Sequence, residues 1–223
     1  MLDFLYRYQK IYRSLDKKSG GEYYHEQRTN YNLQRFNVDY DKYSENWVPR
    51  AAQLIFLNRT YYNGLYRVNS KGEFNSLLGD YENPTICDEQ NLLAVHKVLQ
   101  ISEIKRADFY SIIHDLKLNA FIYYDPPYRP ISKTAGFKNY SKNYFSDSEQ
   151  IRLSKLFNTL TERGVLQMLS NSDPKNVDHN DDFFDTIYQN HNIVRVPAKR
   201  MINSNAQKRG LINEIVVTNY QVA

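Results

Sequence analysis

Cysteine, long apolar runs and glycine-rich loops are scarce in this sequence, and each scarcity excludes a class of protein. The single cysteine, Cys87, excludes an intramolecular disulfide, and its place before an expected helix favours a structural thiol over a nucleophile. No apolar segment approaches the roughly 20 residues that span a bilayer, and the first residues lack the apolar core of a signal peptide. We therefore expect a cytoplasmic globular protein, because 223 residues suffice for a buried core.

Glycine and histidine are present without the spacings that bind phosphate or metal. The eight glycines form no phosphate-binding loop, and Gly20-Gly21 lies in a polar stretch that predicts a flexible joint. The five histidines lack metal-ligand spacing, and the polar segment 178–182 favours a loop that caps a helix over a metal site. The sequence therefore predicts no metal.

The most informative segment reads FIYYDPPY, from Phe121 to Tyr128. It is an apolar run of strand length followed by an acid, two prolines and an aromatic residue. Tandem prolines cannot continue a sheet, so the backbone must leave the strand right after Asp125. The segment predicts a carboxylate, a proline carbonyl and an aromatic face at the carboxyl end of a strand, where open α/β sheets bind ligands. The alternative is a plain strand exit whose acid is merely solvated.

This cluster suits methylation of the exocyclic amine of a flipped nucleobase. The lone pair of such an amine is delocalised into the ring, so the nitrogen is a poor nucleophile. Asp125 and the carbonyl of Pro126 could each accept one amine hydrogen and favour the pyramidal nitrogen that attacks a methyl donor. Tyr128 would stack on the extruded base, an interaction worth roughly 1–3 kcal/mol.

Residues of about 60–80 predict a β-hairpin, because YYNG at 61–64 and NSKG at 69–72 are turn signals beside short β-prone runs. Together with FIYYDPPY, the string NRTYYNGLYRVN at 58–69 resembles the Dam-type DNA adenine methyltransferases, which methylate adenine within GATC and related sites. Their recognition hairpin carries a similar NR-x-x-YNGL-x-R-x-N string. The resemblance covers nearly the whole chain from about residue 22 onward.

The resemblance implies S-adenosylmethionine as methyl donor, double-stranded DNA as substrate, and a place in DNA methylation or restriction–modification. It implies that Arg67 reads a guanine and that Leu65 touches a thymine methyl. It implies that Tyr62 and Asn63 fill the space that the flipped adenine leaves. The implied catalytic residues are Asp125, Pro126, Pro127 and Tyr128. The implied cofactor contacts are Asp125 and Phe137. The further implied DNA contacts are Arg59, Asn69, Lys138, Lys199, Arg200, Asn205 and Arg209.

Two departures from the family pattern bear on function. The family usually has NVPFG where this chain has NSLLG at 75–79, which leaves the preference at outer base pairs open. Family members also open with an aromatic-GGK segment and an F-x-G-x-G strand that bind the cofactor, and neither occurs here. The chain therefore looks like a carboxyl-terminal portion whose strand at 119–124 lacks its family neighbour. We expect weak or no S-adenosylmethionine binding by this chain alone, and a partner chain that supplies the missing amino-terminal strands.

Two basic runs without acids follow expected strands. The first, residues 126–145, contains Arg129, Lys133, Lys138 and Lys142; the second, residues 195–210, contains Arg195, Lys199, Arg200, Lys208 and Arg209. Solvated surface charge is one interpretation. Their expected position on the rim of the sheet beside Asp125 favours phosphate contacts.

The order of elements predicts an α/β protein with a Rossmann-like methyltransferase fold, an incomplete sheet and a helical and β-hairpin DNA target-recognition domain. Helices are expected at about 2–18, 22–35, 46–59, 88–100, 108–117, 146–163 and 181–190, and strands at 119–124, 164–170, 193–198 and 213–220. Ser146 and Glu149 form a capping-box pattern. The expected domains are an amino-terminal helix and linker at 1–21, the recognition domain at 22–115 and the catalytic half-sheet with DPPY at 116–223.

Three hypotheses remain open at this point. The chain is the catalytic portion of a GATC-type adenine methyltransferase that is active with its missing cofactor half. Alternatively, it is a truncated, inactive remnant that still binds DNA. A methyltransferase acting on RNA or protein amides, where a similar acid/Asn-Pro-Pro-aromatic motif recurs, is disfavoured by the YNGLYR hairpin.

Overall fold

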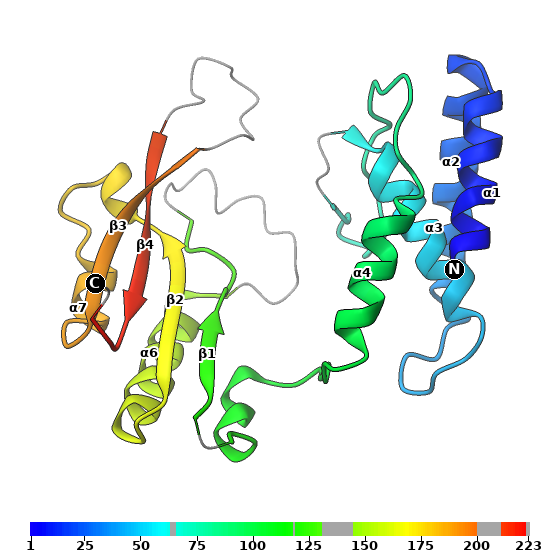
Figure 1. Cartoon of the computed structure of the whole chain (residues 1–223). Helices are drawn as coiled ribbons and strands as arrows, with labels where there is room; N and C mark the ends of the chain where they lie inside the picture. Colours follow the sequence, from blue (N-terminus) through cyan, green and yellow to red (C-terminus); the bar gives the residue numbers. More distant parts are fainter. Residues whose placement is uncertain (63–65, 118, 131–144, 200–210, 222–223) are drawn as a thin grey trace. The chain divides into compact units, whose positions relative to one another are not determined.

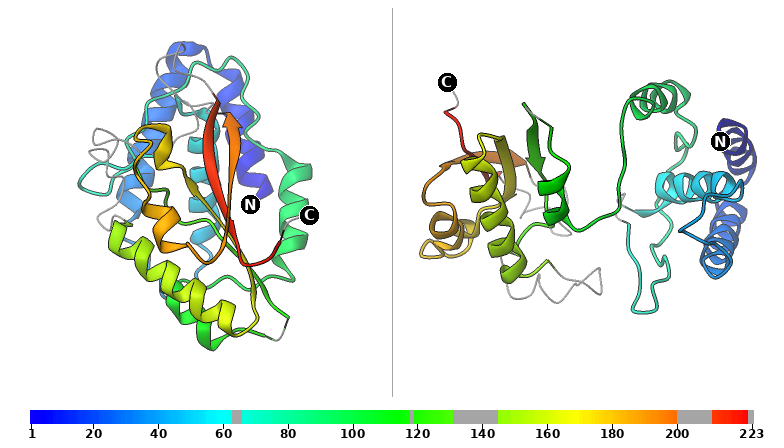
Figure 2. Two further views of the ribbon diagram at one scale, coloured as in Figure 1. Left: turned by 90° about the vertical axis from the view of Figure 1, so that its left-hand side faces the viewer. Right: turned by 90° about the horizontal axis from the view of Figure 1, so that it is seen from below.

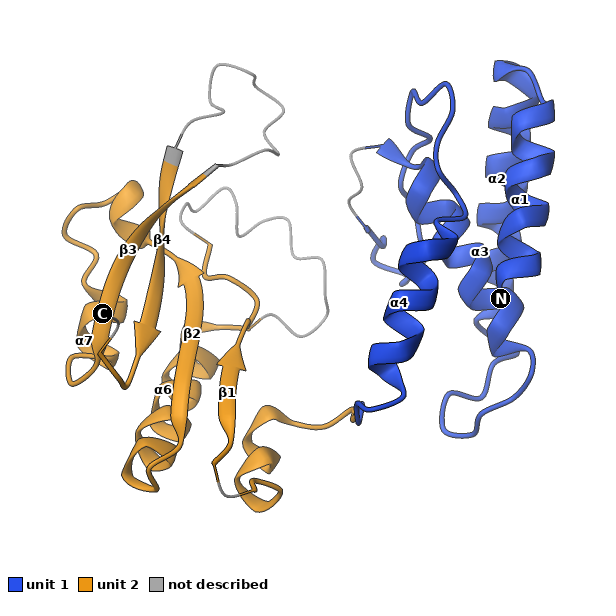
Figure 3. Ribbon diagram, in the orientation of Figure 1, with its two compact units in different colours: residues 1–104 blue, residues 105–223 orange. Residues whose placement is uncertain are grey.

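The computed structural model of the chain describes residues 1–62, 66–117, 119–130, 145–199 and 211–221. It divides into two compact units, residues 1–104 and residues 105–223 (Figure 3). The second unit begins earlier than the predicted residue 116. The reason is the short 3-10 helix η2 (Phe109–His114), whose apolar side chains pack against the core of the second unit.

The described residues of unit 1 include the α-helices α1 (Leu2–Ser14), α2 (Lys17–Gln34), α3 (Trp47–Thr60) and α4 (Glu89–Leu99) (Figure 1). Helix α3 packs against both α1 and α2. Phe56 of α3 is fully buried, and the rings of Tyr8, Tyr12 and Tyr23 lie 5.0, 5.7 and 5.6 Å from its ring. Several of the twenty tyrosines therefore build this core.

The predicted flexible joint at Gly20-Gly21 is wrong, because both glycines lie inside α2. The side chain of Asp16 caps the helix by accepting a hydrogen bond from the backbone N–H of Ser19 at 2.8 Å. Gly20 lies against Tyr12, whose ring would be 3.6 Å from an added Cβ. Capping and close packing outweigh the roughly 1 kcal/mol that a glycine costs within a helix.

The predicted hairpin in unit 1 is present around the second turn signal. Val68 and Phe74 form an antiparallel bridge, and the N–H of Gly72 donates to the carbonyl of Asn69 at 2.9 Å. Gly72 has a φ of 73°, a conformation that favours glycine. The amide side chain of Asn32 on α2 accepts from the N–H of Phe74 at 2.8 Å and donates to its carbonyl at 3.0 Å. The hairpin is thus held on α2 by two hydrogen bonds from one side chain.

In the part of unit 2 that the structure describes, four strands form a mixed sheet in the order β1-β2-β4-β3 (Figure 1). Its strands are β1 (Phe121–Tyr124), β2 (Leu166–Ser172), β3 (Asn192–Lys199) and β4 (Leu211–Thr218). β1 and β2 are parallel, whereas β4 runs antiparallel to both β2 and β3. The parallel pair and the closing antiparallel pair are both confirmed.

Helix α6 (Asp147–Glu162) covers one face of this sheet, together with η2 and the short α7 (Phe183–Ile187) (Figure 2). The side chain of Ser146 caps α6 by accepting from the N–H of Glu149 at 3.4 Å, as the capping pattern predicts. The buried core on this face joins the strands to the helices through Ile122, Tyr124, Leu156, Phe157, Leu160, Leu169, Phe184, Ile215 and Val217.

The opposite face of the sheet is open within the described residues. Side chains alternate along β1, so Ile122 and Tyr124 are buried whereas Phe121 and Tyr123 are 55% and 54% exposed. Leu166 on β2 and Val194 on β3 are also exposed on this face. Among the described strands β1 pairs only with β2, and its other edge carries no described partner. Within the described residues, the sheet therefore has one apolar face exposed and one unpaired edge at β1.

Several elements are shorter or shifted relative to the sequence prediction. The helix expected at 108–117 is the six-residue η2, and the helix expected at 181–190 is the five-residue α7. β2 starts at Leu166 rather than at 164, because Gly164 forms a turn with a φ of 78°. A further 3-10 turn, η3 (Pro174–Asn176), follows β2. None of the described helices combines the length and apolar character needed to cross a bilayer.

Candidate active site

The site is organised by the exit of the chain from β1. The strand ends at Tyr124, and the two prolines that follow Asp125 take the backbone out of the sheet. Asp125, Pro126 and Pro127 line one cavity of about 880 Å³ within unit 2. The predicted catalytic acid and the predicted proline carbonyl are thus brought together at the carboxyl end of a parallel strand.

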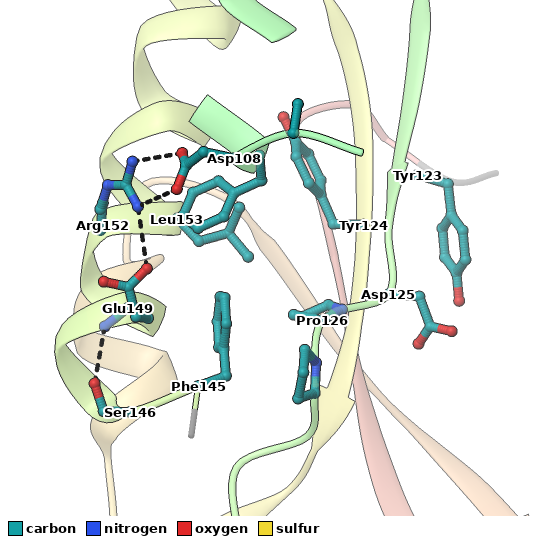
Figure 4. A pocket seen from close by; sticks show the side chains of 13 residues that line it. Asp108, Tyr123, Tyr124, Asp125, Pro126, Phe145, Ser146, Glu149, Arg152 and Leu153 are labelled. Carbon is teal, nitrogen blue, oxygen red and sulfur yellow. Dashed lines mark hydrogen bonds and ion pairs between the residues drawn. The ribbon is translucent and has the colours of Figure 1, made fainter. Parts of the chain in front are cut away.

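One wall of the cavity holds an arginine between two acids. Arg152 of α6 donates to Asp108 at 2.9 Å and to Glu149 at 3.1 Å, and its guanidinium lies 4.7 Å from the ring centroid of Phe109 (Figure 4). The hydrogen bond from Arg152, followed by one from the backbone N–H of Tyr110, lowers the pKa of Asp108. This wall therefore presents a carboxylate that stays ionised at neutral pH.

Aromatic rings line the same side of the cavity. The rings of Phe109 and Phe145 lie 5.8 Å apart and are tilted by 55°. Figure 4 shows Phe145 and Leu153 on one side of β1, and Asp125 and Tyr123 on the other. The cavity thus offers apolar ring faces next to the acid–arginine cluster, while Asp125 stands at its border toward the open face of the sheet.

Asp125 is held by neighbours on that open face. The hydroxyl of Ser170 on β2 donates to Oδ1 of Asp125 at 3.3 Å and is bonded to the hydroxyl of Tyr123 at 2.9 Å. Tyr128 is 38% exposed, and its hydroxyl donates to Glu214 at 3.5 Å. Partial burial raises the pKa of Tyr128, so its ring is a neutral phenol at physiological pH. The ring that is expected to stack on a base is therefore accessible rather than packed in the core.

The interpretation of Arg129 and Arg195 as phosphate contacts is not supported by their surroundings. Arg129 is paired with Asp147 and Asp181, and the hydrogen bond to Asp147 raises its pKa. Arg195 is paired with Asp173 and Asp185. Their own sequence runs lack acids, but the fold brings in acids from other segments.

The described part of the recognition hairpin lies in unit 1. Arg59 is exposed in the last turn of α3, and Tyr62 is 60% exposed. Arg67 is exposed and donates to the side-chain oxygen of Asn75 at 2.9 Å and to its carbonyl at 3.2 Å, which orients the guanidinium. Asn69 uses its amide within the turn, accepting from Lys71 and Glu73 N–H groups and donating to the Glu73 carboxylate.

The remaining predicted residues lie outside the described part of the chain. These are Asn63, Leu65, Phe137, Lys138, Arg200, Asn205 and Arg209. Lys199 ends β3, but its side chain is not among those described.

Sequence reasoning missed the acid–arginine wall and Ser170. Asp108 and Arg152 are 44 residues apart, and no local spacing joins them. The sequence pattern assigns Glu149 only to a capping box, whereas in the structure its carboxylate also accepts a hydrogen bond from Arg152. The one signal for Ser170 in the sequence is its position. It carries a hydroxyl two residues before the end of the strand that follows the DPPY strand and pairs with it.

Comparison with known proteins gives a consistent result. A family model described as the D12 class N6 adenine-specific DNA methyltransferase matches residues 2–202. The chain is 45% identical over 208 residues to the Type II methyltransferase M.MjaIII of Methanocaldococcus jannaschii, covering 93% of this chain and 68% of that protein. It is 38% identical over 182 residues to the Type II methyltransferase M1.LlaDCHI of Lactococcus lactis subsp. cremoris, covering 81% of this chain and 61% of that protein.

A more distant relative agrees. The DNA adenine methylase of Escherichia coli is 30% identical over 190 residues, covering 82% of this chain and 62% of that protein. The matched stretch thus spans 61–68% of the length of these three relatives.

Proposed function

Because the chain belongs to the D12 class N6 adenine-specific DNA methyltransferase family, we propose that it acts in methyl transfer from S-adenosylmethionine to the exocyclic amine of a flipped adenine in a GATC-like site of double-stranded DNA. The observation that carries the proposal is the position of Asp125 and Pro126, which line one cavity at the end of β1. In this assignment unit 1 is the target-recognition domain and unit 2 is the Rossmann-like catalytic half-sheet.

The chemistry of the cavity suits a nucleoside-containing methyl donor. Its volume of about 880 Å³ lies in the range of small-molecule sites. Phe109 and Phe145 offer faces for a purine ring, and the ionised Asp108 offers acceptors for hydroxyl or amine hydrogens. When bound, S-adenosylmethionine supplies an electrophilic methyl group on a positively charged sulfur. We assign its place to this cavity, with Asp125 at the border and Phe137 as a further contact.

Asp125 and Pro126 activate the amine in this proposal. The Asp125 carboxylate and the Pro126 carbonyl oxygen each accept one amine hydrogen, which localises the lone pair on nitrogen. A bound donor would supply the methyl carbon that this nitrogen attacks, and its sulfur would keep the electron pair of the broken carbon–sulfur bond. The methylated nitrogen then releases one proton toward Asp125, whose carboxylate Ser170 orients. Tyr128 stacks on the flipped base and holds it in place.

The hairpin supplies sequence recognition in this proposal. Arg67 donates to the two acceptors of a guanine in the major groove, and its bonds to Asn75 reduce the entropy lost on binding. Leu65 contacts a thymine methyl, and Tyr62 and Asn63 fill the space of the flipped adenine. Arg59, Asn69, Lys138, Lys199, Arg200, Asn205 and Arg209 make further DNA contacts, with Asn69 contributing mainly by shaping the turn.

The variant Asp125→Ala tests the proposed chemistry. Transfer should fall by at least about 100-fold, because loss of one preorganised acceptor typically costs 10²–10³ in rate. DNA binding should be retained. The measurement is protection of a GATC-containing plasmid from a nuclease that cleaves the unmethylated site, with Asp41→Ala, an exposed acid of unit 1, as the control. Full protection by Asp125→Ala would show that this carboxylate is not part of the reaction.

A second candidate is a chain that binds DNA but transfers no methyl group by itself. The uncovered face and the open edge of β1 favour it, since an interior-type strand exposes backbone groups and apolar side chains. We propose that further strands and helices cover this side in the active enzyme, either in one longer polypeptide or in a partner chain. Calorimetry separates the candidates: the chain alone should bind S-adenosylmethionine weakly or not at all, and micromolar binding would remove the need for a complementing segment.

A further inference from the structure

Arg129 follows the DPPY motif directly, and its guanidinium is enclosed by three side chains from two other segments. It donates to both carboxylate oxygens of Asp147, at 2.8 and 3.1 Å, and to Asp181 at 2.7 Å. Its carbon atom Cζ lies 4.4 Å from the ring centroid of Phe183. Only 19% of the side chain is exposed. Arg129 thus forms an internal tie, by which we mean a set of ion pairs that links the start of α6 to the loop that leads into α7.

Buried polar side chains form hydrogen bonds with the backbone of the residues on both sides of Tyr128. Gln150 of α6 donates to the carbonyl of Pro127 at 3.1 Å, and Asn171 of β2 accepts from the N–H of Arg129 at 2.9 Å. Gln150 and Asn171 are fully buried and bonded to each other at 3.3 Å. The hydroxyl of Ser172 donates to the carbonyl of Arg129 at 2.5 Å. The backbone of Pro127 and of Arg129 is therefore fixed by three side chains, in addition to the ion pairs of the Arg129 guanidinium.

We propose that Arg129 is a positioning residue that holds the DPPY exit loop in the geometry required for methyl transfer. The inference rests on the proposed function of Asp125 and Pro126. The Pro126 carbonyl and the Tyr128 ring must both meet the flipped base, and they lie within three residues of this tie. Displacement of a reacting group by about 1 Å can cost about 100-fold in rate, so a loosened loop should lower the turnover rate.

Removal of the guanidinium would leave Asp147 and Asp181 without their shared cation. Their carboxylates would repel each other, and the loop would lose its connection to both segments. The backbone bonds from Gln150, Asn171 and Ser172 would remain, so the fold should persist while the loop becomes more mobile. A lysine at this position keeps the charge but not the bidentate geometry, so it should restore part of the effect.

The experiment compares Arg129→Gln and Arg129→Lys with Arg195→Gln in the whole chain. Arg195 is a matched control, because it too is paired with two acids in unit 2 but lies on β3, outside residues 126–130. For Arg129→Gln we expect faster amide exchange at residues 128 and 129, the positions of this loop between its prolines, a kcat about 10- to 100-fold lower, and an unchanged KM for DNA. Arg129→Lys should lie between this variant and the wild type, and Arg195→Gln should keep both the exchange at residues 128 and 129 and kcat.

The alternative interpretation of Arg129 as a phosphate contact makes a different prediction. Loss of one phosphate contact reduces the slope of log K against log salt by about 0.9 and weakens DNA binding, with no change in amide exchange. That result would overturn the inference, as would an unchanged kcat in Arg129→Gln. Kinetics are measured on the form of the protein that transfers methyl groups, alone or with a complementing segment. If no form transfers methyl groups, the proposed function fails, and the amide exchange of the chain alone still decides whether Arg129 holds the loop.

Discussion

At the residue scale, the local environment of a side chain decides whether it is available for chemistry. Asp125, Arg67 and Arg129 are all charged residues in segments that the sequence marked for function. Asp125 borders a cavity, Arg67 is exposed on a hairpin, and Arg129 is enclosed by two acids. The first two environments are compatible with direct contact to substrate, whereas the third describes a structural tie.

Arg67→Ala should relax discrimination at one guanine of the target site. Two hydrogen bonds to one base are worth about 1–3 kcal/mol, so binding to the cognate duplex should weaken 5- to 150-fold and binding to a duplex substituted at that base should not. Competition binding with a set of single-substituted duplexes provides the measurement. Lys71→Ala in the same hairpin is the control and should affect all duplexes equally. A uniform loss in Arg67→Ala would contradict base reading.

At the element scale, hydrogen bonds between segments distant in sequence fix the loops that carry function. The hairpin is attached to α2 by Asn32, and the loop after β2 is attached to β3 by the pairs of Arg195. Long-range ion pairs also hold the short elements α7 and η2, neither of which is long enough to form alone. Arg195 pairs with Asp185 of α7, and Arg152 pairs with Asp108 at the start of η2.

Asn32→Ala should destabilise unit 1 by about 1–3 kcal/mol, because it leaves the N–H and carbonyl of Phe74 without their partner. Urea unfolding followed through the fluorescence of the single tryptophan, Trp47, measures this change within unit 1. Asn30→Ala, at an exposed position of the same helix, is the control. A difference below about 0.5 kcal/mol between the two variants would show that the hairpin does not depend on Asn32.

Acidification should loosen the attachment of α7 to β3 through Asp185. Burial alone would raise the pKa of Asp185, but hydrogen bonds from Arg195 and Lys175 outweigh it, so the pKa is lowered. A lowered folded-state pKa means that the stabilisation is complete above the unfolded value of about 3.9 and is lost as pH falls through the folded value. The protection of β3 amides against exchange, relative to the intrinsic rate at each pH, should therefore fall more between pH 6 and pH 3 in the wild type than in Asp185→Asn. Asp178→Asn is the control, and equal pH dependence in wild type and Asp185→Asn would exclude this role.

At the scale of the whole molecule, the apolar face of unit 2 that the described residues leave open is the feature on which we expect activity to depend. Phe121, Tyr123, Leu166, Val194 and Val196 are each more than 40% exposed on one side of the sheet. The curated relatives are longer than the stretch that this chain matches. Cofactor binding is therefore the property that we expect to depend most on what covers this face.

Phe121→Asp should leave the chain folded but prevent a complementing segment from docking on it. The charge on the open face lowers its apolar character, so the chain alone should stay folded and become more soluble. Docking of a complementing segment should be lost, because it would bury the carboxylate. The measurement is methylation after mixing with the part of the Methanocaldococcus jannaschii relative that lies outside the matched stretch, compared with Leu33→Asp, an exposed apolar position in unit 1. Equal methylation in both variants would show that this face is not the docking surface.

Much of this protein follows from its sequence alone. The end of β1 just before Asp125, the capped helix that starts after Ser146 and the turn at Gly72 are set by local rules, because prolines, caps and glycines act on their immediate neighbours. The closing antiparallel pair was also predicted, from the order of the elements. The family was also predicted from two short strings, and the comparisons confirm it.

Only the tertiary structure decided which of the basic side chains form ion pairs with acids. The acid-free runs around Arg129 and Arg195 predicted phosphate contacts, yet the fold places acids from residues 147, 181, 173 and 185 against them. Likewise, the sequence predicted a flexible joint at Gly20-Gly21. In the structure these residues are helical, with Asp16 capping the helix and Tyr12 packed against Gly20. Electrostatic pairing and packing depend on distance in space, and a sequence lists only distance along the chain.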